Sequence, residues 1–112
     1  MSSLTRRSVL LACATGAFIT VSGTTAEAAL RYYPVAPGYR VNVRRGPGTQ
    51  YPITRVLPEG AMVPIFCQTP GERITGPYGT STIWDNIDDG EFISDTYVQT
   101  GTDGYVRPRC SF

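Results

Sequence analysis

The fold is decided by one stretch of the chain, Tyr39-Arg40-Val41-Asn42-Val43-Arg44-Arg45-Gly46-Pro47-Gly48-Thr49-Gln50-Tyr51-Pro52. Val41 and Val43 are apolar and their neighbours on either side are polar, a period of two that is typical of a β-strand with one buried face. Gly46-Pro47-Gly48 follows and favours a sharp reversal of the chain. The stretch therefore predicts a strand at about residues 39–44 that runs into a tight loop.

Residues 1–28 predict an export signal peptide. Arg6-Arg7 precedes an apolar run from Val9 to Val21 that is too short to span a bilayer, and Ala26-Glu27-Ala28 offers a small-x-small cleavage site. We expect a mature chain that begins at about Ala29, is secreted to an extracellular or cell-wall location, and has no membrane segment after cleavage. A buried amphipathic helix is the alternative, but nothing polar interrupts the run at helical spacing.

The export route is left open by two motifs. The stretch Thr5 to Leu10 resembles a twin-arginine motif, but Val9 stands where an aromatic residue is usual, so the general secretion route remains an alternative. Leu10-Leu11-Ala12-Cys13 resembles a lipoprotein cleavage box. Cleavage there would leave only a short apolar stub before Cys13, and we rank lipidation below simple secretion.

The charge of the mature chain disfavours several functions. Removal of residues 1–28 takes away Arg6, Arg7 and Glu27, which leaves eight arginines, eight acids and a net charge of zero. The chain has no lysine and no histidine. We therefore expect no binding to nucleic acid, which depends on neutralising phosphates, and the commonest general base and metal ligand is missing.

Catalytic and metal sites are also not expected. No base stands beside a serine, and the acids cluster in one hairpin instead of on two separated strands, so we expect a binding protein rather than an enzyme. Asp85, Asp88, Asp89 and Glu91 do not follow the alternating spacing of a calcium loop, and Ile87 stands where a ligand is needed. We expect no metal and no cofactor.

The mature chain is long enough for one small domain that needs a covalent staple. A domain of this size buries roughly 60% of the surface that its unfolded chain exposes. Cys13 leaves with the signal, and Cys67 and Cys110 remain as an even pair in an oxidising compartment. The sequence therefore predicts a Cys67–Cys110 disulfide, with two free thiols as the alternative. The bridge would stabilise the fold by about 4 kcal/mol on the chain-entropy model.

The rest of the chain predicts short strands separated by turns. We interpret residues 29–38 as a lead-in that covers a sheet edge, and expect strands at 39–44, 54–57, 61–68, 73–75, 82–87, 91–94 and from 105 onward. Turns are expected at 46–48, 58–60 and 69–71, a loop at 76–81, a hairpin at Asp88-Asp89-Gly90, and one helical turn capped at Ser94. In residues 61–68 the period of two predicts that Val63, Ile65 and Cys67 face inward. This pattern is typical of a small all-β barrel.

Several of these motifs occur in the order found in bacterial SH3-like domains, of the secreted kind common in actinobacteria. The similar segments are Val41 to Arg44, Gly46 to Gly48, Tyr51-Pro52, Leu57 to Gly60, Trp84-Asp85 and Gly90 to Val98. Arg45 and the long segment Gly71 to Ser81 depart from the family pattern. The resemblance implies an SH3-like domain at residues 39–112. Its expected fold is a half-open barrel of five to seven short strands with a single short helical turn.

The resemblance also implies a function, namely binding of cell-wall (peptidoglycan) peptide or glycan, and one bridge between the middle strand and the C-terminus. Such domains are usually attached to a wall hydrolase, and here none follows. The alternative partner is a secreted protein, bound as an effector or inhibitor with the segment Gly71 to Ser81 as the contact. We expect a monomer.

The candidate ligand-binding residues are Tyr51, Tyr78, Trp84, Asp85 and Tyr97. Aromatic faces suit sugar rings and short peptides because they offer a large contact area at little entropic cost. Core packing is the alternative, and for Trp84 it is the stronger one.

Charge along the chain is uneven, with arginines before Gly60 and acids after Ser81. We favour cross-strand pairing, of Arg40, Arg44 or Arg55 with Asp85 or Glu91, over a two-signed surface that orients a partner.

Overall fold

The structure is a computed structural model that describes residues 30–111, and the residues from Arg31 onward make one folded unit. The predicted signal peptide, its cleavage site and Cys13 lie outside the described residues. Within those residues the chain forms seven strands and one 3-10 turn: β1 (Tyr32–Pro34), β2 (Val41–Arg44), β3 (Ile53–Leu57), β4 (Met62–Pro64), β5 (Cys67–Gly76), β6 (Gly79–Asp88), β7 (Glu91–Ser94) and η2 (Asp95–Tyr97).

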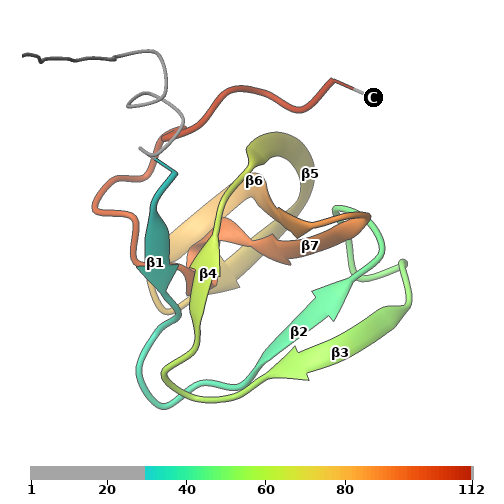
Figure 1. Cartoon of the computed structure of the whole chain (residues 1–112). Helices are drawn as coiled ribbons and strands as arrows, with labels where there is room; N and C mark the ends of the chain where they lie inside the picture. Colours follow the sequence, from blue (N-terminus) through green and yellow to red (C-terminus); the bar gives the residue numbers. More distant parts are fainter. Residues whose placement is uncertain (1–29, 112) are drawn as a thin grey trace, which may run out of the picture. The chain divides into compact units, whose positions relative to one another are not determined.

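The strands form two antiparallel sheets (Figure 1). One sheet has the order β3-β2-β7-β6-β5 and the other pairs β1 with β4. The prediction of an all-β fold with a single short helical turn is confirmed, and the arrangement is consistent with a small β-barrel. The lead-in supplies β1. The side of β1 that does not pair with β4 is hydrogen-bonded to the segment around Tyr97: Ala36 donates its N–H to the Tyr97 carbonyl at 2.8 Å, and Gln99 donates its N–H to the Pro34 carbonyl at 2.9 Å.

The core forms where the two sheets face each other. The alternation in β2 is confirmed, since Val41 and Val43 are buried, Asn42 is exposed and Arg44 is half-buried. The buried apolar cluster comprises Val35, Val41, Val43, Leu57, Val63, Ile65, Ile87, Ile93 and Val98. Its members come from both sheets, so the two sheets are held together by burial of a shared apolar layer.

The segment 61–68 was expected as one strand, and the structure divides it between the two sheets. β4 pairs with β1 and β5 pairs with β6, and the chain crosses from one sheet to the other at Ile65-Phe66. Val63 and Ile65 are buried as the period of two predicted, and Cys67 is half-buried. Pro64 ends β4, which places its missing N–H at a strand terminus.

The expected turn at 69–71 and the expected loop at 76–81 are wrong. β5 continues through both Pro70 and Gly71, β6 starts at Gly79, and only two residues form the hairpin tip. The register of the pairing is irregular between Pro70 and Ile74, and such a bulge accommodates a residue without an N–H. Gly71 is needed here because a Cβ would lie 2.8 Å from Cδ1 of Trp84.

The C-terminal segment was expected to begin a last strand at Tyr105, which is wrong. Pro108 has no N–H, and the segment makes only an isolated parallel bridge between Gln68 and Arg109. The predicted disulfide is confirmed, and joins Cys67 to Cys110 with Cα atoms 4.9 Å apart. A disulfide of this kind is compatible with an extracellular location.

Two smaller predictions are confirmed around β7. Asp89-Gly90 forms the turn between β6 and β7, with Gly90 at a φ of 67°. Ser94 caps η2, because its hydroxyl oxygen accepts a hydrogen bond from the Thr96 backbone N–H at 3.3 Å. Among residues 30–111, the structure contains no helix with the length and apolar character needed to cross a membrane.

Candidate functional site

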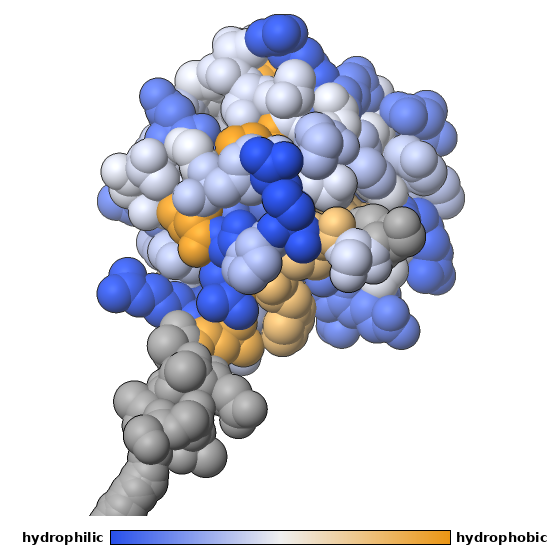
Figure 2. Space-filling view, turned by 90° about the horizontal axis from the view of Figure 1, so that it is seen from above, coloured by the Kyte–Doolittle hydropathy of each residue, from blue (hydrophilic) through white to orange (hydrophobic). Residues whose placement is uncertain are grey.

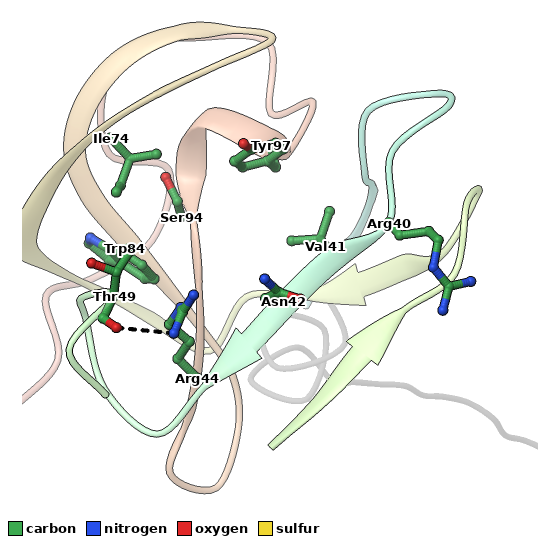
Figure 3. Close-up of a pocket in the computed structure, with 9 residues that line it drawn as sticks. All are labelled: Arg40, Val41, Asn42, Arg44, Thr49, Ile74, Trp84, Ser94 and Tyr97. Atoms are coloured by element: carbon green, nitrogen blue, oxygen red, sulfur yellow. Dashed lines mark hydrogen bonds between the residues drawn. The ribbon is translucent and has the colours of Figure 1, made fainter. Parts of the chain in front are cut away.

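A groove of about 250 Å³ lies over the polar face of β2, and we call it the β2 groove. Its lining, drawn in Figure 3, consists of Arg40, Val41, Asn42, Arg44, Thr49, Ile74, Trp84, Ser94 and Tyr97. These residues come from β2, the loop after it, β5, β6, β7 and η2. The groove therefore combines aromatic, aliphatic, hydroxyl, amide and guanidinium groups from segments far apart in the sequence.

Arg44 fixes one end of the groove. Its Nη1 donates to the carbonyl oxygens of Thr49 at 3.1 Å and Tyr51 at 3.0 Å, so the guanidinium anchors the loop after β2. Figure 3 shows Arg44 pointing toward Thr49 and Trp84, whereas the Arg40 side chain points away from them. Of the two arginines, only Arg44 therefore presents its charge to the centre of the groove.

Thr49 also joins this loop to β5. Its N–H and its hydroxyl both donate to Oε1 of Glu72, at 2.6 and 2.7 Å. The bond from the Thr49 N–H, followed by the bond from its hydroxyl, holds the pKa of Glu72 below its ordinary value. Glu72 is thus a carboxylate at the rim of the groove, and the loop is preorganised by contacts on both sides.

Trp84 and Tyr97 are the two aromatic members of the groove. Trp84 is only 2% exposed and its Nε1 donates to the Glu72 carbonyl at 2.9 Å, so its ring is fixed mainly by packing. Tyr97 is half-buried and meets Tyr39 edge to face, with ring centroids 5.7 Å apart. The burial of Trp84 favours the core-packing alternative for this residue, and Tyr97 is the aromatic side chain of the groove that is partly open to solvent.

The other predicted aromatic residues lie elsewhere. Tyr51 is 38% exposed and its ring lies beside Gly46, where an added Cβ would come within 2.6 Å of it. Tyr78 is at the tip of the β5–β6 hairpin and lines a different hollow. The structure therefore brings Trp84 and Tyr97 together but places Tyr51 and Tyr78 outside the groove lining.

Asp85, which was predicted to bind ligand, is fully buried and does not line the β2 groove. Its Oδ1 accepts a hydrogen bond from Nε2 of Gln68 at 2.7 Å, and it ends a run of three consecutive buried residues on β6, Ile83 to Asp85. The expected arginine–acid pairing is therefore wrong for Asp85. It is confirmed for Arg55 and Glu91, which form an ion pair at 2.9 Å.

Burial has a strong electrostatic effect on Asp85. Removal from water, and then the charge of neighbouring Asp95, raise the pKa of Asp85 to about 9. Burial also raises the pKa of Asp95. Among the described residues, Oδ2 of Asp85 has no hydrogen-bond partner. At neutral pH Asp85 is therefore an uncharged acid inside the domain, behind the groove.

Gln68 is the hub of this buried cluster. Its Oε1 accepts the backbone N–H groups of Val106 at 2.7 Å and Arg107 at 2.9 Å, while its Nε2 donates to Asp85. No sequence pattern predicts this role, because a glutamine that follows an inward-facing residue in an alternating strand is expected on the solvent-exposed face. Gln68 holds the C-terminal segment against β5, next to the disulfide.

Asn42, Arg44, Thr49, Ile74 and Ser94 are groove residues that the sequence analysis did not select. The polar positions of β2 were visible in the alternation, so Asn42 and Arg44 could have been found from it. Ile74 could not, because the short strand expected at 73–75 carried no sign that it pairs with β6. Within residues 30–111 no group of three or more histidines, cysteines or acids is arranged to hold a metal ion.

Comparison with known proteins identifies close relatives. No family model matches the chain. The chain is 41% identical to the uncharacterized protein YraI of Bacillus subtilis strain 168, in an alignment 122 residues long that covers 100% of each chain. It is 44% identical over 93 residues to the uncharacterized protein YraJ of the same strain, which covers 74% of this chain and 79% of the relative. The chain belongs to the family of Bacillus subtilis YraI and YraJ.

Proposed function

We propose that the protein is a secreted SH3-like binding module, not an enzyme, that recognises cell-wall peptide or glycan through the β2 groove. The observation that carries the proposal is the meeting of Trp84 and Tyr97 with Asn42 and Arg44 in one preorganised hollow. Aromatic faces accept sugar rings or peptide side chains, and a small number of polar groups then fixes the ligand's orientation.

The electrostatics of the groove support a ligand that carries amides and carboxylates. Arg44 supplies a cation, Asn42 supplies both a donor and an acceptor, and the Glu72 carboxylate lies nearby. A peptide stem of the cell wall presents both signs of charge along with amides. A fixed cation in the groove and a fixed anion beside Thr49 complement such a ligand.

Secretion is supported by the disulfide and by the sequence of residues 1–28. A bridge between Cys67 and Cys110 is stable in an oxidising compartment. The export signal read from the sequence would deliver the chain there.

Co-sedimentation with insoluble cell wall tests the proposal. Asn42→Trp fills the groove from an exposed position on β2, where an aromatic residue suits the strand. Glu59→Trp, at the exposed turn after β3, is the matched control. We expect the wild type and the Glu59→Trp variant to sediment with the wall and the Asn42→Trp variant to stay in the supernatant. Wild-type protein found wholly in the supernatant at both low and high salt would contradict the proposal.

An alternative function, binding of a secreted protein as an effector or inhibitor, is favoured by a different surface. Tyr32, Met62 and Phe66 are 58%, 54% and 45% exposed and line a hollow of about 330 Å³. Residues 71–81, the segment expected to contact such a protein, belong to the β5–β6 hairpin. On the face that Figure 2 shows, hydrophobic residues occur in small groups between hydrophilic ones. A protein that co-purifies with the wild type and is lost from the Phe66→Ser variant would favour this alternative.

A further inference from the structure

A third hollow, of about 470 Å³, is lined mainly by the loop that follows Tyr97, and we call it the loop hollow. Its lining consists of Tyr78, Val98, Gln99, Thr100, Gly101, Thr102 and Asp103. The volume lies within the range of small-molecule sites, about 300–1,000 Å³. None of its lining residues belongs to the β2 groove, so it is a separate site.

The loop that forms the hollow is ordered by its own hydrogen bonds. Gln99 donates its N–H to the Pro34 carbonyl at 2.9 Å, and the Thr100 hydroxyl donates to the Thr102 carbonyl at 3.0 Å. The Gly104 N–H donates to the Thr102 hydroxyl at 3.2 Å. Both threonine hydroxyls are thereby used to shape the loop, which preorganises the polar wall of the hollow.

Tyr78 lines the hollow from the tip of the β5–β6 hairpin, and its backbone is fixed. Its N–H donates to the Thr96 carbonyl at 3.1 Å. The hairpin also packs closely on η2, because a Cβ at Gly76 would lie 2.6 Å from the Thr96 hydroxyl oxygen. The Tyr78 side chain is nevertheless 39% exposed. An aromatic side chain is thus held beside the loop with part of its surface open to solvent.

Three polar side-chain groups remain available in the loop hollow. Among the described residues, the Gln99 amide, the Asp103 carboxylate and the Tyr78 hydroxyl make no side-chain hydrogen bond. The amide offers donors and an acceptor, and the carboxylate offers acceptors only. Asp103 is the single charged group in the lining, so the hollow repels anions. Val98 is its one aliphatic side chain, so the hollow offers little to a purely apolar ligand.

We propose that the loop hollow is a saccharide-binding site. The apolar face of a pyranose ring would stack on Tyr78, while its hydroxyl groups donate to Asp103 and exchange hydrogen bonds with the Gln99 amide. A neutral ring with several hydroxyl groups can form hydrogen bonds with the Gln99 amide, the Asp103 carboxylate and the Tyr78 hydroxyl, and it brings no second charge into the hollow. The proposal stands apart from the β2 groove, since each site has its own lining and binds without the other.

Titration of the isotope-labelled protein with chitotetraose and with cellotetraose, followed by amide NMR shifts, tests this site. We expect shifts at Tyr78 and residues 98–103 at millimolar sugar. Binding of both sugars indicates recognition of ring hydroxyls, and binding of chitotetraose alone indicates that the acetamido group contributes; either supports the site. No shift with either sugar, or shifts confined to residues outside the loop hollow, would overturn the proposal.

Variants locate the binding and separate it from the groove. Tyr78→Ala should weaken sugar binding about tenfold, and Tyr78→Phe should retain most of it because the ring remains. Asp103→Ala, in an exposed loop, should weaken binding without affecting the fold. Tyr32→Ala, which removes an exposed tyrosine outside the hollow, is the control. In the Asn42→Trp variant the shifts at Tyr78 and residues 98–103 should persist, because none of these residues lines the β2 groove. Shifts at residues 98–103 that survive both Tyr78→Ala and Asp103→Ala would refute the assignment.

Discussion

At the residue scale, the polar groups inside the domain distinguish it from a purely apolar β-barrel. Gln68 satisfies both of its polar ends inside the domain, yet Asp85 keeps one carboxyl oxygen without a partner among the described residues. A buried acid of this kind is tolerated when it stays protonated. The groups that face it are Gln68 and Asp95, and Asp103 in turn acts on Asp95.

The first prediction concerns the pH dependence of stability. The pKa of Asp85 is 3.8 in the unfolded chain and about 9 in the folded one, so between these values the folded state holds a proton that the unfolded state has released. The free energy of unfolding therefore falls as the pH rises through this interval. The contribution of protonated Asp85 to stability is fully present only below the pKa of the unfolded chain.

Urea unfolding at acidic, neutral and alkaline pH measures this effect. We expect the wild-type midpoint to fall toward alkaline pH and the midpoint of the Asp85→Asn variant to stay flatter, with a residual slope from Asp95. The variant should also be the more stable protein at alkaline pH. Parallel pH profiles for the two proteins would show that Asp85 does not carry the proton.

The second prediction concerns Gln68. Gln68→Leu leaves the backbone N–H groups of Val106 and Arg107 without their acceptor and removes the donor to Asp85. We expect a loss of about 3 kcal/mol in the free energy of unfolding, because each buried group left unpaired costs about 1–3 kcal/mol. Faster hydrogen exchange at these two amides should accompany it. A loss no larger than that of Gln99→Leu, on the surface loop, would contradict the role of hub.

At the scale of elements, features that depend on neighbouring residues were predicted correctly, whereas the pairing of strands distant in the sequence was not. The alternation at Val41 and Val43, the hairpin turn at Asp89-Gly90 and the cap at Ser94 depend on local chemistry, and all were predicted. Pro70 and Gly71 were predicted to form a turn, because the bulge that accommodates them exists only when β5 pairs with β6. The same limit hid Ile74 from the candidate site.

The third prediction concerns the β5–β6 hairpin. Gly71→Val places side-chain atoms against the Trp84 ring and the loop after β2, where even a Cβ has no room. We expect a loss of about 1–3 kcal/mol from overpacking, together with a shift of the Trp84 fluorescence. Gly101→Val is the control: the position has open space around it, but its φ of 91° strains a valine. This variant should therefore lower the free energy of unfolding without changing the Trp84 fluorescence. An unchanged Trp84 signal in Gly71→Val would contradict the packing.

At the scale of the whole molecule, stability depends on linking the C-terminal segment to β5. A small domain has little apolar surface to bury, and the segment makes no regular strand. The fourth prediction is that the double variant Cys67→Ser and Cys110→Ser loses about 4 kcal/mol of unfolding free energy. Thermal unfolding with and without reductant checks this, and a midpoint of the wild type that reductant leaves unchanged would contradict it.

The central claim, that the β2 groove binds cell-wall polymer, is tested most directly by titrating the labelled protein with soluble cell-wall fragments and recording NMR shifts residue by residue. The predicted result is a contiguous set of shifts at Asn42, Thr49 and Tyr97 and at the Trp84 indole N–H, lost in the Asn42→Trp variant. Shifts absent from these groups, or equally present in that variant, would contradict the claim.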